Sequence, residues 1–370
     1  METHKVIIHD LARGGSGVGK LDTGEIIFVP FTAPGDEVLV RITKSHKNYH
    51  EGERTEILRP STSRITPPCP VFEKCGGCSW QHIPYPLQFE TKKKGLLQAL
   101  KRGGPVPEGI PLDEFPAEQH YHYRNRVQLR GLPAEKKIGY YAHASKTVIG
   151  IDHCPIAEAK INEALPTLAQ EGFGQFNEEF KLEIDVSPKG EVRHAFNQAH
   201  AAFGFRQVND EQNIKLQHWI QTHFPKGDLL LDLYGGAGNL SLPLARHFKE
   251  VHCVDMSSPF ADAATPKHFH YEKMDMVKWA KTPTRVAETL RKTSVILDPP
   301  REGISSYFEK IEAKISRHDV ERLALIGCDV DSFVRDTHRF IKAGYRLERL
   351  GVLDLFPQTP HVESLALFSK

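Results

Sequence analysis

The chain has 370 residues and a mass of 41.8 kDa, which corresponds to two or three domains of about 100–200 residues each. Its 48 Lys and Arg nearly balance 47 Asp and Glu, and 39% of the residues are hydrophobic, so the composition excludes a disordered or fibrous chain. No stretch approaches the roughly 18 apolar residues of a membrane span, and METHKVIIHD does not have the pattern of a secretory signal. We therefore expect a cytoplasmic protein with no membrane partner. A nucleic acid would have to be bound by locally basic surfaces, because the net charge is +1.

Residues 1–60 predict a small all-β domain. Alternating runs such as EIIFVPF and DEVLVRITKSHK are separated by Gly, Pro and Asp turns. The segment ARGGSGVGK is rich in glycine but lacks the spacing of a phosphate-binding loop, so it predicts a hairpin turn.

Residues 61–205 predict a second, central α+β domain. A helix is expected over 86–102, and a β stretch follows it. Basic and aromatic side chains alternate between Tyr121 and Arg126. Such a mixture is suited to RNA phosphates and bases, although an ordinary charged surface has the same composition.

The cysteines of this central region have the spacing of metal ligands. Cys69, Cys75 and Cys78 form a C-x5-C-x2-C run, and Cys154 in DHCPI is the fourth candidate. Four thiolates suit either a tetrahedral zinc ion or a cubane iron–sulfur cluster. Three neighbouring ligands and one distant ligand favour the cluster, and zinc is the alternative. Cys253, in the apolar segment VHCVD, is expected to be a buried core residue.

Residues 206–370 alternate strand-like and helical segments, which predicts a doubly wound, mostly parallel α/β sheet of the Rossmann-like type. Its first strand runs into a glycine turn in LLLDLYGGAGNLSLPLA, and an acidic residue closes the second strand. Both an S-adenosylmethionine site and a dinucleotide site have these features. The D-x-x-G-G-x-G spacing, which lacks the third Rossmann glycine, favours S-adenosylmethionine. The candidate cofactor-binding residues are Asp232, Tyr234, Gly235, Gly238, Asp255 and, after the third strand, Asp275.

The fourth and fifth strands carry candidate catalytic groups. The fourth ends in Asp298-Pro299-Pro300, a stiff tip that faces the methyl donor in many methyltransferases, including those that methylate amino groups of bases. Methylation of uracil at C5 has a further requirement, because C5 becomes nucleophilic only after a thiolate adds to C6, and a base must then remove the C5 proton. Cys328, at the end of the fifth strand, is the candidate nucleophile. Glu363, near the last strand, is the candidate base.

Seven segments occur in an order that resembles the RNA (uracil-5-)-methyltransferases of 23S ribosomal RNA and tRNA. They are CPVFEKCGGCSWQHIPYPLQ, YHYRNRV, DHCPI, FRQVN, DLYGGAGNLSLPLA, LDPPREG and FPQTPHVESLALF. The resemblance implies an N-terminal TRAM domain, an OB-like RNA-binding barrel, and a class I S-adenosylmethionine-dependent methyltransferase domain. It also implies a [4Fe–4S] cluster on the four cysteines, Cys328 as nucleophile and Glu363 as base. Gln207 and Asp298 are implied to contact the uracil and the cofactor.

One segment departs from the family pattern. The family reads Ser-Cys-Asn-Pro around the nucleophile, whereas this chain reads Gly327-Cys328-Asp329-Val330. A negative charge at Asp329 is expected to raise the pKa of the thiol and slow its attack. We expect a monomeric enzyme that forms 5-methyluridine in RNA, with 23S ribosomal RNA favoured over tRNA. The alternatives are a tRNA enzyme, an RNA-binding iron–sulfur protein with a degenerate site, and an amino-group methyltransferase.

A uridine within folded RNA must be flipped out of its stack before it can react. Phe205, Tyr123 and Arg206 are the candidates to stack on it.

Overall fold

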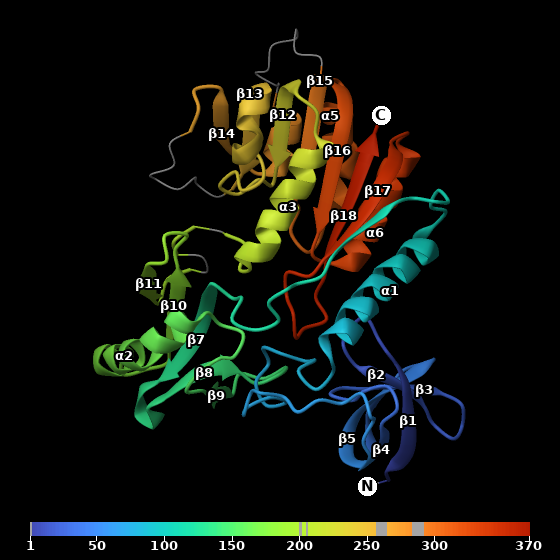
Figure 1. Cartoon of the computed structure of the whole chain (residues 1–370), viewed down its shortest axis with the longest axis vertical. Helices are drawn as coiled ribbons and strands as arrows, with labels where there is room; N and C mark the ends of the chain where they lie inside the picture. The colour runs from blue at the N-terminus through green and yellow to red at the C-terminus, as the bar shows by residue number, and fades with distance from the viewer. Residues whose placement is uncertain (1, 200–201, 205, 257–264, 283–291) are drawn as a thin grey trace. The chain divides into compact units, whose positions relative to one another are not determined.

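The computed structural model describes residues 2–199, 202–204, 206–256, 265–282 and 292–370 (Figure 1). These residues belong to two compact units. The first comprises residues 1–95, 118–200 and 356–360, and the second comprises 96–117, 201–355 and 361–370. The first unit contains a closed barrel and a five-stranded sheet, and the second contains an eight-stranded sheet.

The N-terminal strands close into a barrel in the order β1-β2-β3-β5-β4, which confirms the predicted all-β region. Alternate side chains of these strands point inward and form an apolar core, as the period-2 pattern requires. Hydrogen-bonded pairing of β1 with β2 confirms the predicted hairpin. A side chain at Gly19 would lie 2.2 Å from Val6, so only glycine fits this part of the barrel wall. The strands are β1 (His4–Leu11), β2 (Gly17–Lys20), β3 (Ile26–Val29), β4 (Glu37–Ser45) and β5 (Tyr49–Arg59).

The five-stranded sheet of the first unit is antiparallel, with the order β11-β10-β7-β8-β9. Helix α2 (Ala159–Gln175) packs against β7, β10 and β11, and Figure 1 shows it lying along this sheet. The strands are β7 (Arg126–Leu132), β8 (Lys137–Tyr141), β9 (Val148–Gly150), β10 (Phe180–Val186) and β11 (Val192–Phe196). The predicted helix over 86–102 is α1 (Tyr85–Gly103).

The eight-stranded sheet has the order β14-β13-β12-β15-β16-β18-β17-β6. Its first five strands in this order pair in parallel, β18 runs antiparallel to both of its neighbours, and β6 is parallel to β17. The strands are β6 (Leu112–Phe115), β12 (Gly227–Leu233), β13 (Phe248–Asp255), β14 (Phe269–Lys273), β15 (Lys292–Leu297), β16 (Asp319–Gly327), β17 (Arg346–Leu353) and β18 (Glu363–Ser369). The helices between them are α3 (Asp210–His223), α4 (Met276–Lys281), α5 (Phe308–Ile315) and α6 (Val330–Lys342). The α/β prediction for this region is therefore confirmed.

Two details of the second unit were not predicted from the sequence. The segment after the glycine turn is a 3-10 helix, Leu242–His247, with Pro243 in its first turn. The four-residue strand β6, from the stretch assigned to the central domain, pairs with β17 at the edge of the large sheet. Within the described residues, no helix has the length and hydropathy needed to cross a membrane.

Candidate active site and cysteine pocket

The carboxyl ends of the parallel strands meet at one edge of the eight-stranded sheet. Leu233 on β12 is level with Val254 on β13 and with Leu297 on β15. Leu297 is in turn level with Leu325 on β16. The residues that follow these strands therefore lie along a single edge, where open α/β sheets bind their ligands. They include Tyr234, Asp255, Asp298 and Cys328.

The glycine turn after β12 is tightly constrained. Tyr234, Gly236 and Gly238 all have positive φ values, of 62°, 57° and 81°. A side chain at Gly235 would lie 2.5 Å from Asp232 and 2.7 Å from the sulfur of Cys253. The Gly236 N–H donates to Oδ2 of Asp255 at 3.1 Å. The turn thus brings bare backbone to the sheet edge and links it to the acid that closes β13.

Asp232 is a buried acid that is only partly hydrogen-bonded. Its side chain is fully buried, and its Oδ2 accepts a hydrogen bond from the hydroxyl of Ser241. Its Oδ1 meets no hydrogen-bond donor in the described part of the chain. Burial, aided by the charge of Asp255, raises the pKa of Asp232 to about 6. A buried acceptor without a partner is suited to a donor group on a ligand.

The other candidate cofactor residues have different environments. Asp275 is partly buried, and its Oδ1 accepts a hydrogen bond from the Lys278 N–H at 2.8 Å, so this carboxylate caps α4. Gln207 is buried in the segment that leads to Asn209, the residue that caps α3. Cys253 is buried on β13, which confirms its prediction as a core residue.

Strand register brings Cys328 and Glu363 together. Gly327, the last residue of β16, is level with Ser364 on the antiparallel strand β18. Cys328 directly follows Gly327, and Glu363 directly precedes Ser364, so the two residues lie at the end of this ladder. The charge of Glu363 acts on the Cys328 thiol, which shows that the two side chains are near each other. Glu363 is only 3% exposed and is also paired with Leu353 on β17, so its backbone is held from the other side.

The charges around Cys328 form a coupled group. Burial is the main cause that raises the pKa of its thiol to about 12, followed by Glu363 and Asp298, while Arg301 opposes the shift. Burial and the charge of Asp298 raise the pKa of Glu363 well above its usual range. Burial, with Asp232 and Asp255, likewise raises the pKa of Asp298. Two neighbouring carboxyl groups that resist ionisation tend to share a proton, as like charges in one site do.

Asp329 has a structural role that the sequence analysis did not anticipate. It is the N-cap of α6, and its Oδ1 accepts a hydrogen bond from the Ser332 N–H at 2.9 Å. Asn and Asp are nearly equivalent as N-caps, so the Asp that replaces the Asn of the family this chain resembles preserves the cap. The effect of the Asp329 charge on the Cys328 thiol stays a prediction.

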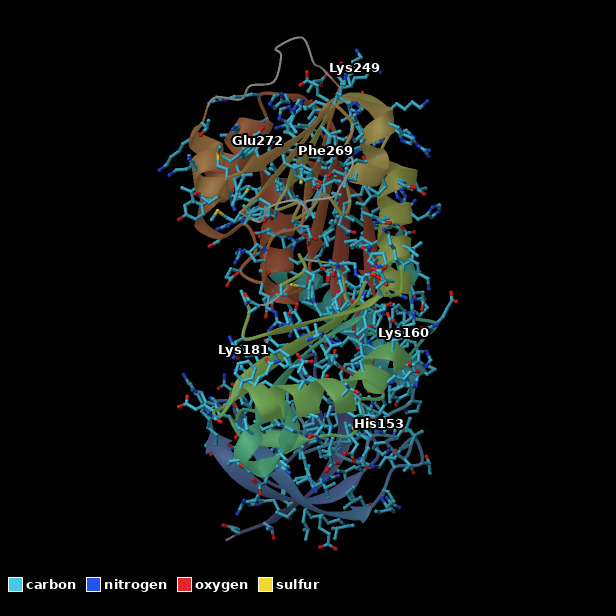
Figure 2. The ribbon with its side chains drawn as sticks, turned by 90° about the vertical axis from the view of Figure 1, so that its left-hand side faces the viewer. His153, Lys160, Lys181, Lys249, Phe269 and Glu272 are labelled. Atoms are coloured by element: carbon cyan, nitrogen blue, oxygen red, sulfur yellow. The ribbon has the colours of Figure 1, made fainter. Side chains whose placement is uncertain are left out.

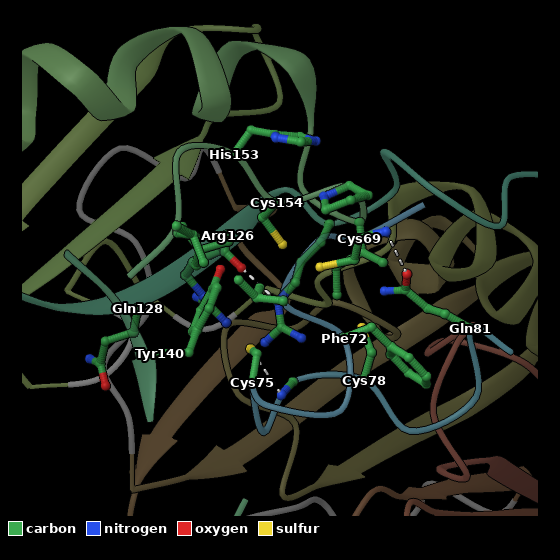
Figure 3. Close-up of a pocket in the computed structure, with 17 residues that line it drawn as sticks. Cys69, Phe72, Cys75, Cys78, Gln81, Arg126, Gln128, Tyr140, His153 and Cys154 are labelled. Carbon is green, nitrogen blue, oxygen red and sulfur yellow. Dashed lines mark hydrogen bonds between the residues drawn. The ribbon is translucent and has the colours of Figure 1, made fainter. Parts of the chain in front are cut away.

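A separate cavity in the first unit contains all four cysteines of the predicted cluster (Figure 3). Its volume is about 220 Å³. In Figure 3 the sulfurs of Cys69, Cys75, Cys78 and Cys154 surround one hollow. Burial raises the pKa of the Cys78 thiol to about 12. The Gly77 N–H donates to the sulfur of Cys75 at 3.4 Å, and the Tyr140 hydroxyl bonds to Cys154.

The spacing of these sulfurs can be compared with the geometry of a zinc site. A tetrahedral zinc ion with Zn–S bonds of about 2.3 Å holds its sulfurs about 3.8 Å apart. Within the described residues, the only His, Cys, Asp and Glu side chains grouped within 4.8 Å of one another as a trio are Glu250, His252 and His270. No three of the four cysteine sulfurs are therefore that close to one another.

Several site residues were not found by sequence reasoning. Arg301 directly follows the D-P-P tip and lowers the pKa of Cys328, and its position in PPREG was the available signal. Arg124, Arg126 and Tyr140 line the cysteine cavity, although they were considered only as RNA-binding candidates or as part of a strand.

The three residues predicted to stack on the uridine differ in how the structure describes them. Tyr123 is buried and donates its hydroxyl to the Pro357 carbonyl at 3.0 Å, so its ring is not exposed for a base. Arg206 is partly buried, and Phe205 lies outside the described residues.

Sequence models of two known families match the chain. The TRAM domain model matches residues 2–54, and the tRNA (Uracil-5-)-methyltransferase model matches residues 185–285. Together with the strand order and the glycine turn, these matches define a methyltransferase of the S-adenosylmethionine-dependent class with an N-terminal TRAM barrel.

Relatives that match almost the whole chain identify the family within this class of methyltransferases. An uncharacterized RNA methyltransferase of Bdellovibrio bacteriovorus is 31% identical, with 98% of this chain and 94% of the relative covered. A protein of Legionella pneumophila named 23S rRNA (uracil(1939)-C(5))-methyltransferase RlmD is 28% identical, with 98% and 96% covered. The chain belongs to the RNA (uracil-5-)-methyltransferase family.

A solved structure shares the fold over the whole length. It is the tRNA (uracil-54, C5)-methyltransferase of Pyrococcus abyssi in complex with S-adenosyl-L-homocysteine. Its TM-score is 0.74 at 23% identity, and 99% of each chain is covered.

Proposed function

We propose that this chain transfers a methyl group from S-adenosylmethionine to C5 of a uridine in RNA. One observation carries the proposal: Cys328 and Glu363 flank the last residue pair of the β16–β18 ladder, and the charges of Glu363 and Asp298 both act on the Cys328 thiol, on the edge that carries the glycine turn. A thiol and a buried carboxyl group are the two groups that C5 methylation requires and that amino-group methylation does not. The arrangement therefore disfavours an amino-group methyltransferase.

Cys328 acts as the nucleophile. Its sulfur forms a bond to C6 of the uracil, and the electrons of the C5–C6 double bond move onto the ring as an enolate. S-Adenosylmethionine, when bound, supplies the electrophilic methyl group that C5 takes up. Glu363 then removes the proton from C5, the C6–S bond breaks, and Cys328 leaves as a thiolate. The net change replaces the C5 hydrogen with a methyl group and releases one proton.

The resting thiol must lose its proton before it can add. Burial keeps Cys328 protonated, because its pKa is raised to about 12. Whichever member of the Asp298–Glu363 pair is ionised can accept this proton. The thiolate is then stabilised by Arg301 and by the N-terminal end of α6, which begins two residues after Cys328.

The residues at the glycine turn fit the cofactor. The unpartnered Oδ1 of Asp232 is an acceptor for its amino group, and Asp255 stands where a ribose can be held. The bare backbone of Tyr234, Gly235 and Gly238 allows a close approach. We assign Gln207, Asp275 and Asp298 to the same site, the first and last by family resemblance. Asp275 would bind the cofactor while its Oδ1 also caps α4.

We propose that Cys69, Cys75, Cys78 and Cys154 hold a [4Fe–4S] cluster. The C-x5-C-x2-C run with one distant cysteine, the shared cavity of about 220 Å³ and the N–H···S contact at Cys75 support the cluster, and zinc is the alternative. Arg124 and Arg126 line the same cavity and would offset its negative charge. A cluster bound there would have a structural role, because it would join the segment of Cys69–Cys78 to the distant Cys154.

The proposed substrate is 23S ribosomal RNA, as the name of the Legionella relative suggests, and tRNA is the second candidate, after the Pyrococcus enzyme. We further propose that residues 1–60 bind RNA, that 61–205 carry the cluster and more RNA-binding surface, and that 206–370 perform the transfer. The enzyme is proposed to act as a cytoplasmic monomer.

The main test is incubation with S-adenosylmethionine and unmodified RNA, with 5-methyluridine measured by mass spectrometry. We expect product in 23S ribosomal RNA with the purified chain and none with Cys328→Ser. Unchanged S-adenosylhomocysteine binding by Cys328→Ser is the control for an intact fold and cofactor site. Binding of S-adenosylmethionine without any methylation of 23S RNA or tRNA would favour the alternative of an RNA-binding protein with a degenerate site.

RNA that contains 5-fluorouridine tests the nucleophile directly, because its C5 substituent cannot leave as a proton. We expect a covalent protein–RNA adduct that is absent from Cys328→Ala. An adduct that persists in this variant would assign the nucleophile to another residue.

Anaerobic purification tests the cluster. We expect a brown protein with about four iron and four sulfide per chain, and loss of colour in Cys78→Ser but not in Cys253→Ser. A colourless protein with one zinc per chain would contradict the cluster.

A further inference from the structure

A second set of metal-binding side chains lies at the far edge of the eight-stranded sheet. β14 is the edge strand and β13 is its neighbour. Glu250 and His252 are two residues apart on β13, and His270 and Glu272 are two residues apart on β14. The register pairs His252 with His270, so all four side chains are on one face of the sheet. Figure 2 labels Glu272 in this part of the molecule.

Three of these side chains converge. One ligand atom each from Glu250, His252 and His270 lies within 4.8 Å of the other two. Nε2 of His252 is 3.3 Å from Oε2 of Glu250, and the rings of His252 and His270 are 4.9 Å apart at their centroids. His252 is buried, whereas His270 is exposed, so an ion could enter from solvent.

The fourth side chain fixes the orientation of the buried imidazole. Oε1 of Glu272 is 2.7 Å from Nδ1 of His252. If Nδ1–H donates to this carboxylate, Nε2 presents a lone pair to the Glu250 carboxylate. Two acceptors at 3.3 Å attract each other only if a proton or a metal ion lies between them. A carboxylate on the outer nitrogen of a histidine is the usual support of a metal-ligating imidazole.

We propose that Glu250, His252 and His270 bind a divalent transition-metal ion of the zinc class, with Glu272 as the positioning residue. Two imidazoles and one carboxylate favour Zn²⁺, Co²⁺ or Ni²⁺ over Mg²⁺ and Ca²⁺, which prefer oxygen ligands. The ion would link the edge strand β14 to β13. It is distinct from the cysteine pocket, which lies in the other compact unit.

The positive groups around the site do not occupy the proposed position. Nζ of Lys314 donates to the carbonyls of Trp279 and Thr282, and its charge interacts with Glu272. His318 interacts electrostatically with His252 and Lys314. Neither makes a hydrogen bond to Glu250 that the structure records within its described residues.

The test uses Co²⁺ as the probe on the full chain purified with its native iron content. Equilibrium dialysis with metal analysis should find one Co²⁺ per chain, with the weak visible bands of nitrogen and oxygen ligands. Binding to the cysteines would instead produce an intense thiolate charge-transfer band, so the spectrum identifies the site. We expect Mg²⁺ not to compete.

Variants assign the ligands. His270→Ala and Glu250→Gln, at partly or fully exposed positions, should each weaken Co²⁺ binding at least tenfold. Glu272→Gln should weaken Co²⁺ binding about 10- to 100-fold, because it removes the carboxylate that orients the His252 ring. His218→Ala, an exposed histidine on α3, is the matched control and should bind as the wild type does. Absence of nitrogen/oxygen-type Co²⁺ binding would mean that a protonated His252 bridges the two carboxylates, and it would overturn the proposal. So would unchanged binding in His270→Ala and Glu250→Gln.

Discussion

Replacement of Gly235 by alanine should weaken cofactor binding without unfolding the protein. The new Cβ would lie 2.5 Å from both Cγ and Oδ2 of Asp232 and 2.7 Å from the sulfur of Cys253. Comfortable contacts between such atoms are about 3.5–4.0 Å, so the overlap is about 1 Å. Both neighbours are buried and face each other on paired strands, which leaves them no room to withdraw. The turn itself must therefore move.

The size of the effect follows from this overlap. Overpacking of a well-packed interior costs about 1–3 kcal/mol. If the turn relaxes away from the cofactor position, that free energy corresponds to an affinity loss of about 5- to 150-fold, at tenfold for each 1.4 kcal/mol. The dissociation constant of S-adenosylhomocysteine, measured by isothermal titration calorimetry, should rise by that factor in Gly235→Ala.

A matched control separates this contact from a general effect of removing glycine. Gly174 lies in α2, and a Cβ there would meet nothing within 4 Å. Gly174→Ala should leave the affinity unchanged and should slightly raise the melting temperature, because alanine favours helix more than glycine does. If Gly235→Ala is folded, as judged by circular dichroism, and binds S-adenosylhomocysteine as tightly as the wild type, then the glycine turn is not the cofactor site.

Three further predictions concern the sheet edge. In Glu363→Gln, Cys328 should still form its bond to uracil, but the C5 proton should not be removed. A covalent protein–RNA complex should therefore accumulate and be visible on denaturing gels. Wild-type amounts of free 5-methyluridine would exclude Glu363 as the base. The pKa of Asp232 is about 6 in the folded protein and 3.8 in the unfolded chain. Ionisation of this buried acid therefore lowers the free energy of unfolding of the cofactor-free protein as the pH rises from about 4 to 6. Above pH 6 the full loss is about 3 kcal/mol. Asp232→Asn should therefore raise the melting temperature at pH 8 much more than at pH 4 while weakening cofactor binding, and an equal shift at both pH values would contradict the buried charge. Asp329→Ala should cost about 1 kcal/mol of stability through the lost α6 cap and Asp329→Asn almost none, as chemical denaturation can measure; equal losses in both would mean that the charge, not the cap, matters.

The parts of the fold that the sequence predicts are those with strong periodicity. The five parallel strands, the D-P-P tip and the buried Cys253 follow from apolar runs that end in turn residues. The proximity of Cys328 and Glu363 could not be read from local sequence, because that sequence does not show that β18 runs antiparallel between β16 and β17. Family resemblance, rather than periodicity, paired these residues.

The missed features arise from pairing between distant segments. β6 has four residues and a partly polar sequence, and it becomes a strand only by pairing with β17. The segments EVH and HYE each place an acid and a histidine on one strand face, but the register that aligns them is a tertiary property. Asp329 is an exception, because an Asp directly before a helix is a capping signal that can be read from the sequence. The comparison with the family pattern drew attention to its charge instead of to its capping role.

The placement of Glu363 in a strand has a mechanical consequence. Glu363 is held in β18 by its pairing with Leu353, and Cys328 directly follows Gly327, which pairs with Ser364, so both groups are anchored next to backbone ladders. Thermal motion should carry both groups together, so their separation stays nearly constant while the surrounding segments change shape. A slip of β18 by a single residue would turn the carboxyl group to the opposite face of the sheet and abolish turnover altogether. Hydrogen-exchange protection of β18 is therefore a direct measure of how firmly the proposed catalytic pair is aligned.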